Sequence, residues 1–374
     1  MSGPLDLDDA TAVAAADPDG MLRAVASSAA QVREAVVLSA EAGLGRLADE
    51  GRPRAVVVCG MGGSGIAGDV LAAVAGPGCP VPVLVHRGFG LPAWVGAADL
   101  VLGVSCSGST HETLSALEEA VRRGCRLLVV GAAGSPVEEL AHRGRGVFVP
   151  VTQGRQPRAS MWSLSVPLLV AGDALGLLSA GPDDLAETAT LLEEVAHRCR
   201  PDADTVVNPG KTLALELSGA LPVVWGASAL TGAVAYRFAC QLNENAATPA
   251  TWGVLPEAGH NQVVGWDGPW AGRRDDDLFR VRADEPEHPV LRLVLLREAG
   301  ELPPVALRAD VCADLAAERG VGVSALLAEG VSAPARLASL VGLTDFASTY
   351  LALSEGTDPT PVAAIAALKA RTAR

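Results

Sequence analysis

Residues 55–65 read Ala-Val-Val-Val-Cys-Gly-Met-Gly-Gly-Ser-Gly, and this stretch decides the fold. Its β-branched first half, which ends at Cys59, predicts a short buried strand. The glycines after Cys59 predict a tight turn, and the apolar spacing from Ile66 to Val74 predicts a helix directly after that turn. A strand, a glycine turn and a helix in this order are typical of an α/β domain with a parallel sheet.

Strands and helices alternate along the rest of the first half of the chain. Short apolar runs predict strands at residues 81–85, 100–104, 126–130 and 147–149, and helical patterns lie at residues 21–50, 112–123 and 136–143. Continuous apolar strands that alternate with helices are typical of a parallel sheet covered on both faces.

The second half repeats this order of elements. A strand at Leu221–Trp225 is followed by the small-residue turn Gly226–Gly232 and by a helix that ends near Asn243. Further strands are predicted at residues 291–296 and 321–327, and helices at residues 333–353 and 362–370. A chain of 374 residues normally forms more than one core. Because Pro- and Asp-bearing stretches occur near residues 181–184 and 200–209, we predict two domains, at residues 1–180 with a helical N-terminal lead and at residues 181–374.

The composition excludes several classes of protein. An apolar fraction of 49% excludes a disordered chain, and a net charge of −14 without a basic block argues against nucleic-acid and anionic-membrane binding. Seven scattered cysteines without a C-x-x-C pair suggest neither a disulfide framework nor a thiolate metal site. The N-terminus is acidic, and Asp173 interrupts the apolar stretch at residues 166–178, so we expect a soluble cytoplasmic protein. Only two of the 29 cationic residues are lysines, Lys211 and Lys369.

The glycine loop formally matches the dinucleotide-binding pattern, with Gly60, Gly62 and Gly65 at the required spacing. A dinucleotide site needs an acidic residue at the end of the next strand, where this chain has His86 and Arg87. A P-loop is excluded because no Lys-Ser/Thr pair follows the glycines. The structural alternative is a tight turn that serves only to connect the strand to its helix.

A second loop, Ser105-Cys-Ser-Gly-Ser-Thr110, also lies between a predicted strand and a predicted helix. Four hydroxyl groups at a helix N-terminus, beside free backbone N–H groups and the positive end of the helix dipole, suit a phosphate monoester. The structural alternative is a helix N-cap, but a cap needs one hydroxyl and not four. An anionic small ligand is therefore expected.

Five motifs occur in order along most of the chain, and together they resemble one family. They are GMGGSGIAGD at residues 60–69, VSCSGSTHET at 104–113, QPRAS at 156–160, NENA at 243–246 and PEAGHNQVVGW at 256–266. A weaker sixth similarity is DPTP at residues 358–361 together with Lys369. The chain resembles the SIS-domain sugar isomerases, specifically the bifunctional phosphoglucose/phosphomannose isomerases.

The resemblance implies two SIS-type (flavodoxin-like) αβα sandwich domains and a homodimer whose active sites lie near the subunit interface. It also implies that glucose 6-phosphate or mannose 6-phosphate is interconverted with fructose 6-phosphate through a cis-enediol, without a metal or a cofactor. Gly62, Gly63 and Ser64 would line the sugar-phosphate site. Ser105, Ser107, Ser109 and Thr110 would bind the phosphate. Arg158 would face the enediolate, Glu244 would be the base, His260 would open the ring and Lys369 would assist at the ring end.

The residue types suit these roles on chemical grounds. One carboxylate can remove and return the proton of an aldose–ketose isomerisation, a guanidinium can stabilise the negative oxygen, and an imidazole can open a hemiacetal ring. The structural alternatives are a helix-end carboxylate for Glu244, a solvated side chain for Arg158, a structural loop histidine for His260 and an exposed tail residue for Lys369. His111, which follows the hydroxyl loop, is a rival to His260 but is expected at the surface.

Three places depart from the family pattern. Cys106 and Ser109 replace an aromatic residue and Asn, Gln262 replaces Glu, and Ala247 replaces Lys. Ser109 and Gln262 keep hydrogen-bonding capacity, so phosphate binding is expected to survive. A non-catalytic sugar-phosphate sensor is the competing class of function. An amidotransferase would need an N-terminal nucleophilic cysteine, and the first cysteine of the chain is Cys59.

Overall fold

The computed structural model describes residues 5–271 and 289–372. The chain divides into two compact units, each of which contains one sheet. The first-sheet unit comprises residues 26–193 and 329–339, and the second-sheet unit comprises residues 1–25, 194–328 and 340–374. The domain boundary expected between residues 180 and 181 stays a prediction.

The first sheet has five parallel strands in the order β2-β1-β3-β4-β5. The strands are β1 (Val56–Cys59), β2 (Val83–His86), β3 (Leu100–Ser105), β4 (Arg126–Ala132) and β5 (Val147–Val151). The other elements before residue 199 are α2 (Met21–Ala26), α3 (Ser28–Glu41), η1 (Leu44–Glu50), α4 (Gly63–Ala75), α5 (His111–Arg122), α6 (Pro136–Arg143), η2 (Pro157–Ala159), α7 (Met161–Ala174) and α8 (Pro182–Arg198), preceded by α1 (Ala10–Ala16).

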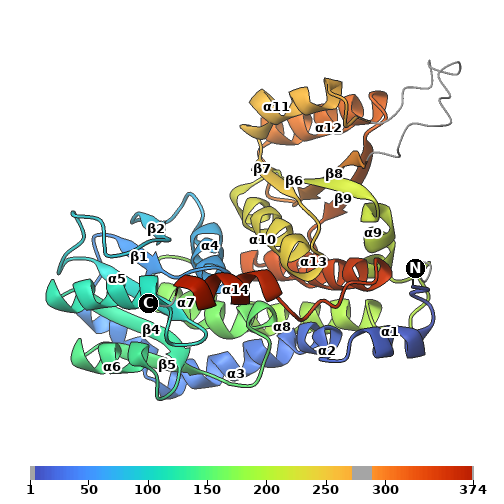
Figure 1. The fold of residues 1–374 in the computed structure, drawn as a ribbon. Coiled ribbons are helices and arrows are strands. Elements are labelled where there is room, and N and C mark those ends of the chain that lie inside the picture. The colour runs from blue at the N-terminus through green and yellow to red at the C-terminus, as the bar shows by residue number, and fades with distance from the viewer. Residues whose placement is uncertain (1–4, 272–288, 373–374) are drawn as a thin grey trace, which may run out of the picture. The chain divides into compact units, whose positions relative to one another are not determined.

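Helices cover both faces of the first sheet (Figure 1). On one face, Val57, Val101 and Val129 form a core with apolar residues of α5 and α6. On the other face, α4 packs so closely that a Cβ at Gly68 would lie 2.9 Å from Val85 and 3.0 Å from Val58. The burial of both faces explains why the three central strands β1, β3 and β4 read as apolar runs.

The second sheet has four parallel strands in the order β7-β6-β8-β9. The strands are β6 (Ala220–Gly226), β7 (Thr251–Val254), β8 (Val290–Arg297) and β9 (Gly322–Leu327). The accompanying elements are α9 (Pro209–Leu217), α10 (Ala229–Asn245), α11 (Ala258–Asn261), η3 (Gln262–Asp267), α12 (Pro303–Glu318), α13 (Ala333–Ser354) and α14 (Ala363–Thr372).

The second core is built around two tryptophans. The rings of Trp225 on β6 and Trp266 on η3 lie 5.0 Å apart and pack with apolar residues of α11 and α12. On α10, the buried Arg237 donates to both carboxylate oxygens of Asp345 on α13, at 3.1 and 2.6 Å. This buried pair needs its two hydrogen bonds because an unpaired charge in a protein core is costly.

The sequence prediction of two α/β halves with parallel sheets is confirmed, but individual elements differ. The expected helical lead at residues 21–50 is broken into α2, α3 and η1, and Gly43 has a φ of 70° between α3 and η1. Strand β7 was not predicted, because it has four residues, one of them glycine, and its first two residues are exposed. Such a strand shows neither an apolar run nor a clean alternation.

Two features of the charge and hydropathy pattern are explained by burial. Among the described residues, α13 alone has the length and hydropathy of a membrane span, and 94% of its most apolar window is buried inside the structure. Lys211 is fully buried and donates to the carbonyl oxygens of Pro201 and Ala203, at 2.9 and 2.7 Å. One of the two lysines is therefore a structural residue that anchors the connection between α8 and α9.

Candidate functional site

The glycine loop at residues 60–65 connects β1 to α4. Its glycines differ in whether the structure would tolerate a side chain at their positions. A Cβ at Gly60 would lie 2.9 Å from the Ser64 carbonyl oxygen, and a Cβ at Gly65 would lie 2.8 Å from the Gly60 carbonyl oxygen. Gly62 has a φ of 52°, which favours glycine. A Cβ at Gly63, in contrast, would meet only the Pro157 carbonyl oxygen, at 3.7 Å. Chain packing therefore accounts for Gly60 and Gly65 and leaves open space at Gly63.

The hydroxyl loop at residues 105–110 connects β3 to α5. The buried Ser105 hydroxyl accepts from the Gly108 N–H at 3.1 Å and lies 3.0 Å from the Thr110 hydroxyl. Ser107 and Ser109 are exposed, and their hydroxyls lie 3.4 Å apart. Thr110 is the N-cap residue of α5, but its side chain makes no capping hydrogen bond. The simple N-cap interpretation therefore does not account for these hydroxyls.

The two loops meet at one edge of the first sheet. Strands β1 and β3 are parallel neighbours, and the chain proceeds from β1 to β2 on one side and from β3 to β4 on the other, so the strand order reverses between them. In open α/β sheets, ligands bind at the carboxyl ends of the strands at this position. A direct contact joins the loops, because the Cys106 N–H donates to the Ser64 hydroxyl at 3.2 Å. The structure thus brings Gly62, Gly63 and Ser64 together with the hydroxyl loop.

Arg158 lies on the short helix η2, next to both loops. The Pro157 carbonyl oxygen faces Gly63, and the Ser160 hydroxyl bonds to the Cys106 thiol. Arg158 itself is only 9% exposed, so it is not the solvated loop arginine that was the structural alternative. Burial raises the pKa of the Cys106 thiol, and the Ser160 bond offsets this only in part. The substitution at Cys106 therefore adds no negative charge beside the loops.

One ion pair at this edge was not predicted. Arg87, which follows β2, pairs with Asp69 on α4 and also donates to the Gly65 carbonyl oxygen at 3.3 Å. Desolvation raises the pKa of the Asp69 carboxyl, and the charge of Arg87 counteracts this shift. The pair fixes α4 to the end of β2, and the only sequence signal for it was the basic residue found where a dinucleotide site needs an acidic one.

Glu244, half-buried, lies in the last turn of α10, in the second-sheet unit. The amides of its two neighbours bond to other parts of the second-sheet unit. Asn243 donates to the Ala239 carbonyl oxygen at 2.7 Å, and Asn245 donates to the Ser348 hydroxyl at 2.9 Å. These bonds fix the final turn of α10 and so hold the backbone on both sides of Glu244.

His260 is exposed on α11, which follows β7. Its Nε2 lies 3.0 Å from Nη1 of Arg308 on α12. A guanidinium can only donate, so Nε2 accepts and the ring proton of the neutral imidazole is on Nδ1. The stem of Arg308 also packs over the backbone, because its Cδ lies 3.2 Å from where a Cβ at Gly259 would be. No pattern in the sequence pointed to this partner.

Topology separates Glu244 from His260 within the second-sheet unit. Helix α10 begins after the carboxyl end of β6 and runs back to the amino end of the sheet, and β7 then runs parallel to β6 toward α11. Glu244 therefore lies beside the amino end of β7, and His260 lies beyond its carboxyl end. At ~3.3 Å per residue, β7 alone spans about 10 Å.

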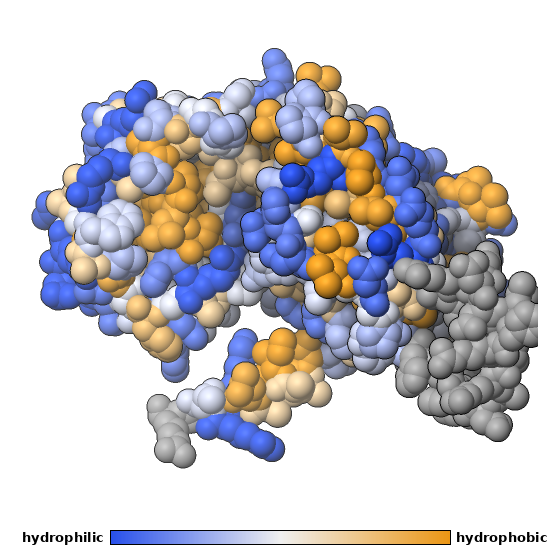
Figure 2. Space-filling view, turned by 90° about the horizontal axis from the view of Figure 1, so that it is seen from above, coloured by the Kyte–Doolittle hydropathy of each residue, from blue (hydrophilic) through white to orange (hydrophobic). Residues whose placement is uncertain are grey.

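The remaining predicted positions have distinct surroundings. Lys369 lies on α14, which has no buried residue, and Figure 2 shows the hydrophobic side chains of this helix at the surface. Gln262 is used structurally, because it accepts from Trp225 Nε1 at 2.7 Å and donates to the Trp252 carbonyl oxygen at 3.2 Å. Ala247 has a φ of 52°. His111 is exposed, as predicted.

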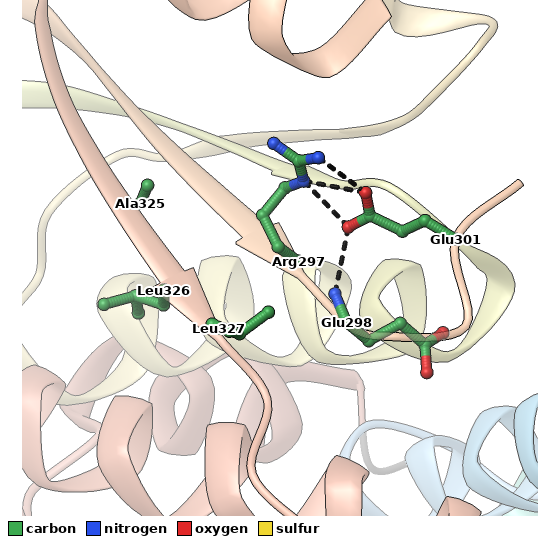
Figure 3. A pocket seen from close by; sticks show the side chains of 6 residues that line it. All are labelled: Arg297, Glu298, Glu301, Ala325, Leu326 and Leu327. Carbon is green, nitrogen blue, oxygen red and sulfur yellow. Dashed lines mark hydrogen bonds and ion pairs between the residues drawn. The ribbon is translucent and has the colours of Figure 1, made fainter. Parts of the chain in front are cut away.

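The second sheet has a pocket of about 260 Å³ at the carboxyl ends of β8 and β9 (Figure 3). It is lined by Arg297, Glu298, Glu301, Ala325, Leu326 and Leu327. Since β8 occupies the place that β3 has in the first sheet, the loop after β8, which lines one side of this pocket, corresponds to the hydroxyl loop. Here Arg297 pairs with Glu301 and with Asp310, each at 2.7 Å, while the Glu298 carboxylate points away from the guanidinium. Pro303 begins α12 without an N–H. The pocket is therefore poorly suited to a phosphate.

Among the residues that the structure describes, no group of three or more His, Cys, Asp or Glu side chains is arranged to hold a metal ion. No disulfide joins the seven cysteines, all of which are described.

Comparisons of the sequence with known proteins find sugar-phosphate isomerases. Residues 206–372 match the family described as the bacterial phospho-glucose isomerase C-terminal SIS domain. A bifunctional phosphoglucose/phosphomannose isomerase from Caldicellulosiruptor bescii is 34% identical over 84% of this chain and 88% of its own length. One of the same name from Aquifex aeolicus is 32% identical over 84% and 89%. The crystal structure of a hypothetical protein from Thermus thermophilus superimposes on this chain with a TM-score of 0.69 and 16% sequence identity, covering 95% of this chain and 90% of that one.

Proposed function

The chain belongs to the bifunctional phosphoglucose/phosphomannose isomerase family, and we propose that it interconverts glucose 6-phosphate and mannose 6-phosphate with fructose 6-phosphate. The observation that carries the proposal is the direct contact between the glycine loop and the hydroxyl loop at the strand-order reversal of the first sheet. This arrangement offers a sugar phosphate open backbone, hydroxyl groups and a helix N-terminus in one place.

The phosphate would bind to the hydroxyl loop. Ser105, Ser107, Ser109 and Thr110 supply short donors, and the uncapped first turn of α5 supplies backbone N–H groups and a positive dipole end. The sugar would lie over Gly62, Gly63 and Ser64, because a Cβ at Gly63 would meet no part of the chain closer than 3.7 Å. These contacts leave the reacting carbons C1 and C2 away from the phosphate.

The isomerisation would need one base and one fixed cation. The Glu244 carboxylate would take the proton from C2 of the aldose and return it to C1 of the cis-enediol, which gives the ketose and restores the carboxylate. Arg158 would stabilise the negative oxygen of the intermediate, a role suited to a buried guanidinium that keeps its proton. If the enediol accepts the proton at either face of C2 in the reverse direction, both hexose epimers result.

His260 and Lys369 would act at the sugar ring. A proton moved between the hemiacetal hydroxyl and the ring oxygen opens the ring, and an imidazole is suited to this transfer near neutral pH. Lys369 would assist from α14, whose exposed apolar face leaves the helix available to pack on a neighbouring surface.

A homodimer is part of this proposal. A general acid or base must lie within about 3 Å of the atom that it serves, yet Glu244 and His260 of one unit are separated by the length of β7. One hexose can contact both residues only if two copies of the chain contribute one residue each. We therefore propose active sites near a subunit interface, in a protein that works in the cytoplasm.

A coupled assay tests the proposed function. Purified protein is given glucose 6-phosphate, mannose 6-phosphate or fructose 6-phosphate in turn, without added metal. Saturable turnover of both hexose 6-phosphates is expected. Saturable binding of fructose 6-phosphate without turnover of any of the three would support a sugar-phosphate sensor instead.

A further inference from the structure

We infer that Gln31, on α3, is a positioning residue of this enzyme, and that it acts by holding the loop that carries Arg158. The inference rests on the proposed function, in which Arg158 stabilises the enediolate. Gln31 is 0% exposed, although glutamine is a residue usually found at the surface. Both the Nε2 and the Oε1 of its amide make polar contacts with the segment around Arg158.

The amide of Gln31 contacts the chain directly after Arg158. Its Nε2 donates to the carbonyl oxygen of Ala159 at 2.6 Å, and its Oε1 lies 3.4 Å from both the backbone N–H and the hydroxyl of Ser163. The amide thereby joins the end of η2 to the first turn of α7. A methyl or thioether in its place would leave the buried Ala159 carbonyl without this donor, which is costly in a protein core.

One turn further along α3, Glu34 holds the chain before Arg158. Its carboxylate accepts from the Thr152 hydroxyl at 2.7 Å and from Arg155 at 2.6 Å. Desolvation acts to raise the pKa of the Glu34 carboxyl, but these hydrogen bonds outweigh it and the pKa is lowered. The charged carboxylate and the amide of Gln31 therefore anchor the loop on both sides of Arg158.

The opposite side of the same loop lies against the substrate-binding loops. Pro157 faces Gly63, and Ser160 bonds to Cys106. Residues 152–156 form no helix or strand of their own, so the contacts of α3 set where η2 lies. Because a displacement of about 1 Å can cost ~10²-fold in rate, loss of one anchor affects catalysis before it affects substrate binding.

The test compares Gln31→Met with Ser39→Ala. Gln31→Met keeps the volume and removes both hydrogen-bonding groups, and we expect kcat to fall about 10- to 100-fold while KM changes less than about threefold. Binding of a phosphorylated hydroxamate that mimics the planar enediolate should weaken by a factor similar to the fall in kcat. Ser39→Ala removes an equally buried polar contact of α3, to the Ala35 carbonyl oxygen, that is remote from the loop, and kcat should stay at the wild-type value.

A double-mutant comparison shows whether Gln31 acts through Arg158. In an Arg158→Ala background, Gln31→Met should lower kcat by less than about twofold, because the group that it positions is gone. A full additional loss in that background, or wild-type kcat and hydroxamate affinity in the single variant, would overturn the inference. If Gln31→Met does not fold, Glu34→Gln is used in its place. For Glu34→Gln we expect a kcat about two- to tenfold lower and the same KM as the wild type. A wild-type kcat in this variant would count against the inference. Failure of the proposed function itself is distinct, since the wild-type chain would then show no turnover.

Discussion

Ser105 is the most constrained hydroxyl of the candidate phosphate site. It is buried at the end of β3, accepts from the Gly108 N–H and lies within hydrogen-bond distance of Thr110. The side chain thus shapes the loop as well as offering a donor. Ser109 is exposed, and its hydroxyl has one weak contact at 3.4 Å, to Ser107.

We predict that Ser105→Ala and Ser109→Ala differ in substrate affinity. Ser105→Ala removes a hydroxyl that orders the loop, so the KM for fructose 6-phosphate should rise about tenfold, which corresponds to ~1.4 kcal/mol. Ser109→Ala should raise KM by less than about threefold, because an exposed and weakly bonded hydroxyl contributes less. Steady-state kinetics with both variants measures this difference, and equal KM values for the two would contradict it.

At the residue scale, the sequence predicts which residue types gather at the site but not which partners hold them. The hydroxyl and glycine loops are local patterns, so Ser64 and Ser105 could be found without a structure. Gln31 is 128 residues from its acceptor Ala159, and Arg308 is 48 residues from His260. Such partners are set by the packing of distant elements, and no local spacing reveals them. The roles of Glu244, His260, Arg158 and Lys369 stay predictions.

At the scale of elements, the connections between strands and helices explain most of the glycines near the site. Gly108 has a φ of 72°, and a Cβ there would overlap the Ser135 side chain. Gly63 is the first residue of α4, with a helical backbone and no close neighbour. One glycine is thus required by the fold, while the other could accept a Cβ, whose nearest atom would be the Pro157 carbonyl oxygen at 3.7 Å.

Substitution of these two glycines should separate stability from binding. Gly108→Ala should lower the free energy of unfolding by about 1–3 kcal/mol, because backbone strain and a clash add together. Gly63→Ala should change it by less than ~0.5 kcal/mol, since alanine favours a helix, but should weaken fructose 6-phosphate binding about tenfold by filling the sugar's space. Chemical denaturation and calorimetric titration measure the two quantities. Wild-type affinity in a stable Gly63→Ala protein would exclude the proposed sugar position.

The elements themselves were predictable where packing makes a regular pattern. Strands β3 and β4 are almost entirely buried, and β8 is buried over residues 293–296. All three were expected close to their observed bounds. Strand β7 is a short edge strand with exposed residues, and α12 carries only three buried residues, so neither shows a strong period. The sequence therefore missed these elements, which adjoin His260, because few of their residues are buried.

At the scale of the whole molecule, the four strands of the second sheet repeat the order of the first four strands of the first sheet, but the two sheets have different surfaces at their carboxyl ends. The first presents hydroxyls and a helix N-terminus, whereas the second presents Glu298 and Glu301 with prolines at the start of α12. The net charge of −14 is compatible with an anionic substrate because the phosphate would be met by local dipoles and donors.

A complementation experiment tests the proposed homodimer. Glu244→Gln and His260→Asn chains should each be inactive or nearly so, but a mixture that exchanges subunits should recover about a quarter of the wild-type activity. This follows because half of the dimers would be mixed, and one of the two sites in each mixed dimer would have both wild-type residues. Light scattering verifies the dimer mass. No recovery in a mixture with proven subunit exchange would mean that one chain supplies both residues.

The central claim is proton transfer between neighbouring carbons by Glu244. The most direct measurement follows fructose 6-phosphate in D₂O by NMR, with wild-type protein and with Glu244→Gln. We predict that the wild type yields glucose 6-phosphate and mannose 6-phosphate with deuterium at C2 in those turnovers in which the Glu244 carboxyl exchanges its proton with solvent before returning it. With Glu244→Gln, which still binds the substrate, the rate should be lower by ~10²- to 10⁴-fold. Turnover of fructose 6-phosphate by Glu244→Gln at the wild-type rate, or no turnover by the wild-type protein, would contradict this role of Glu244.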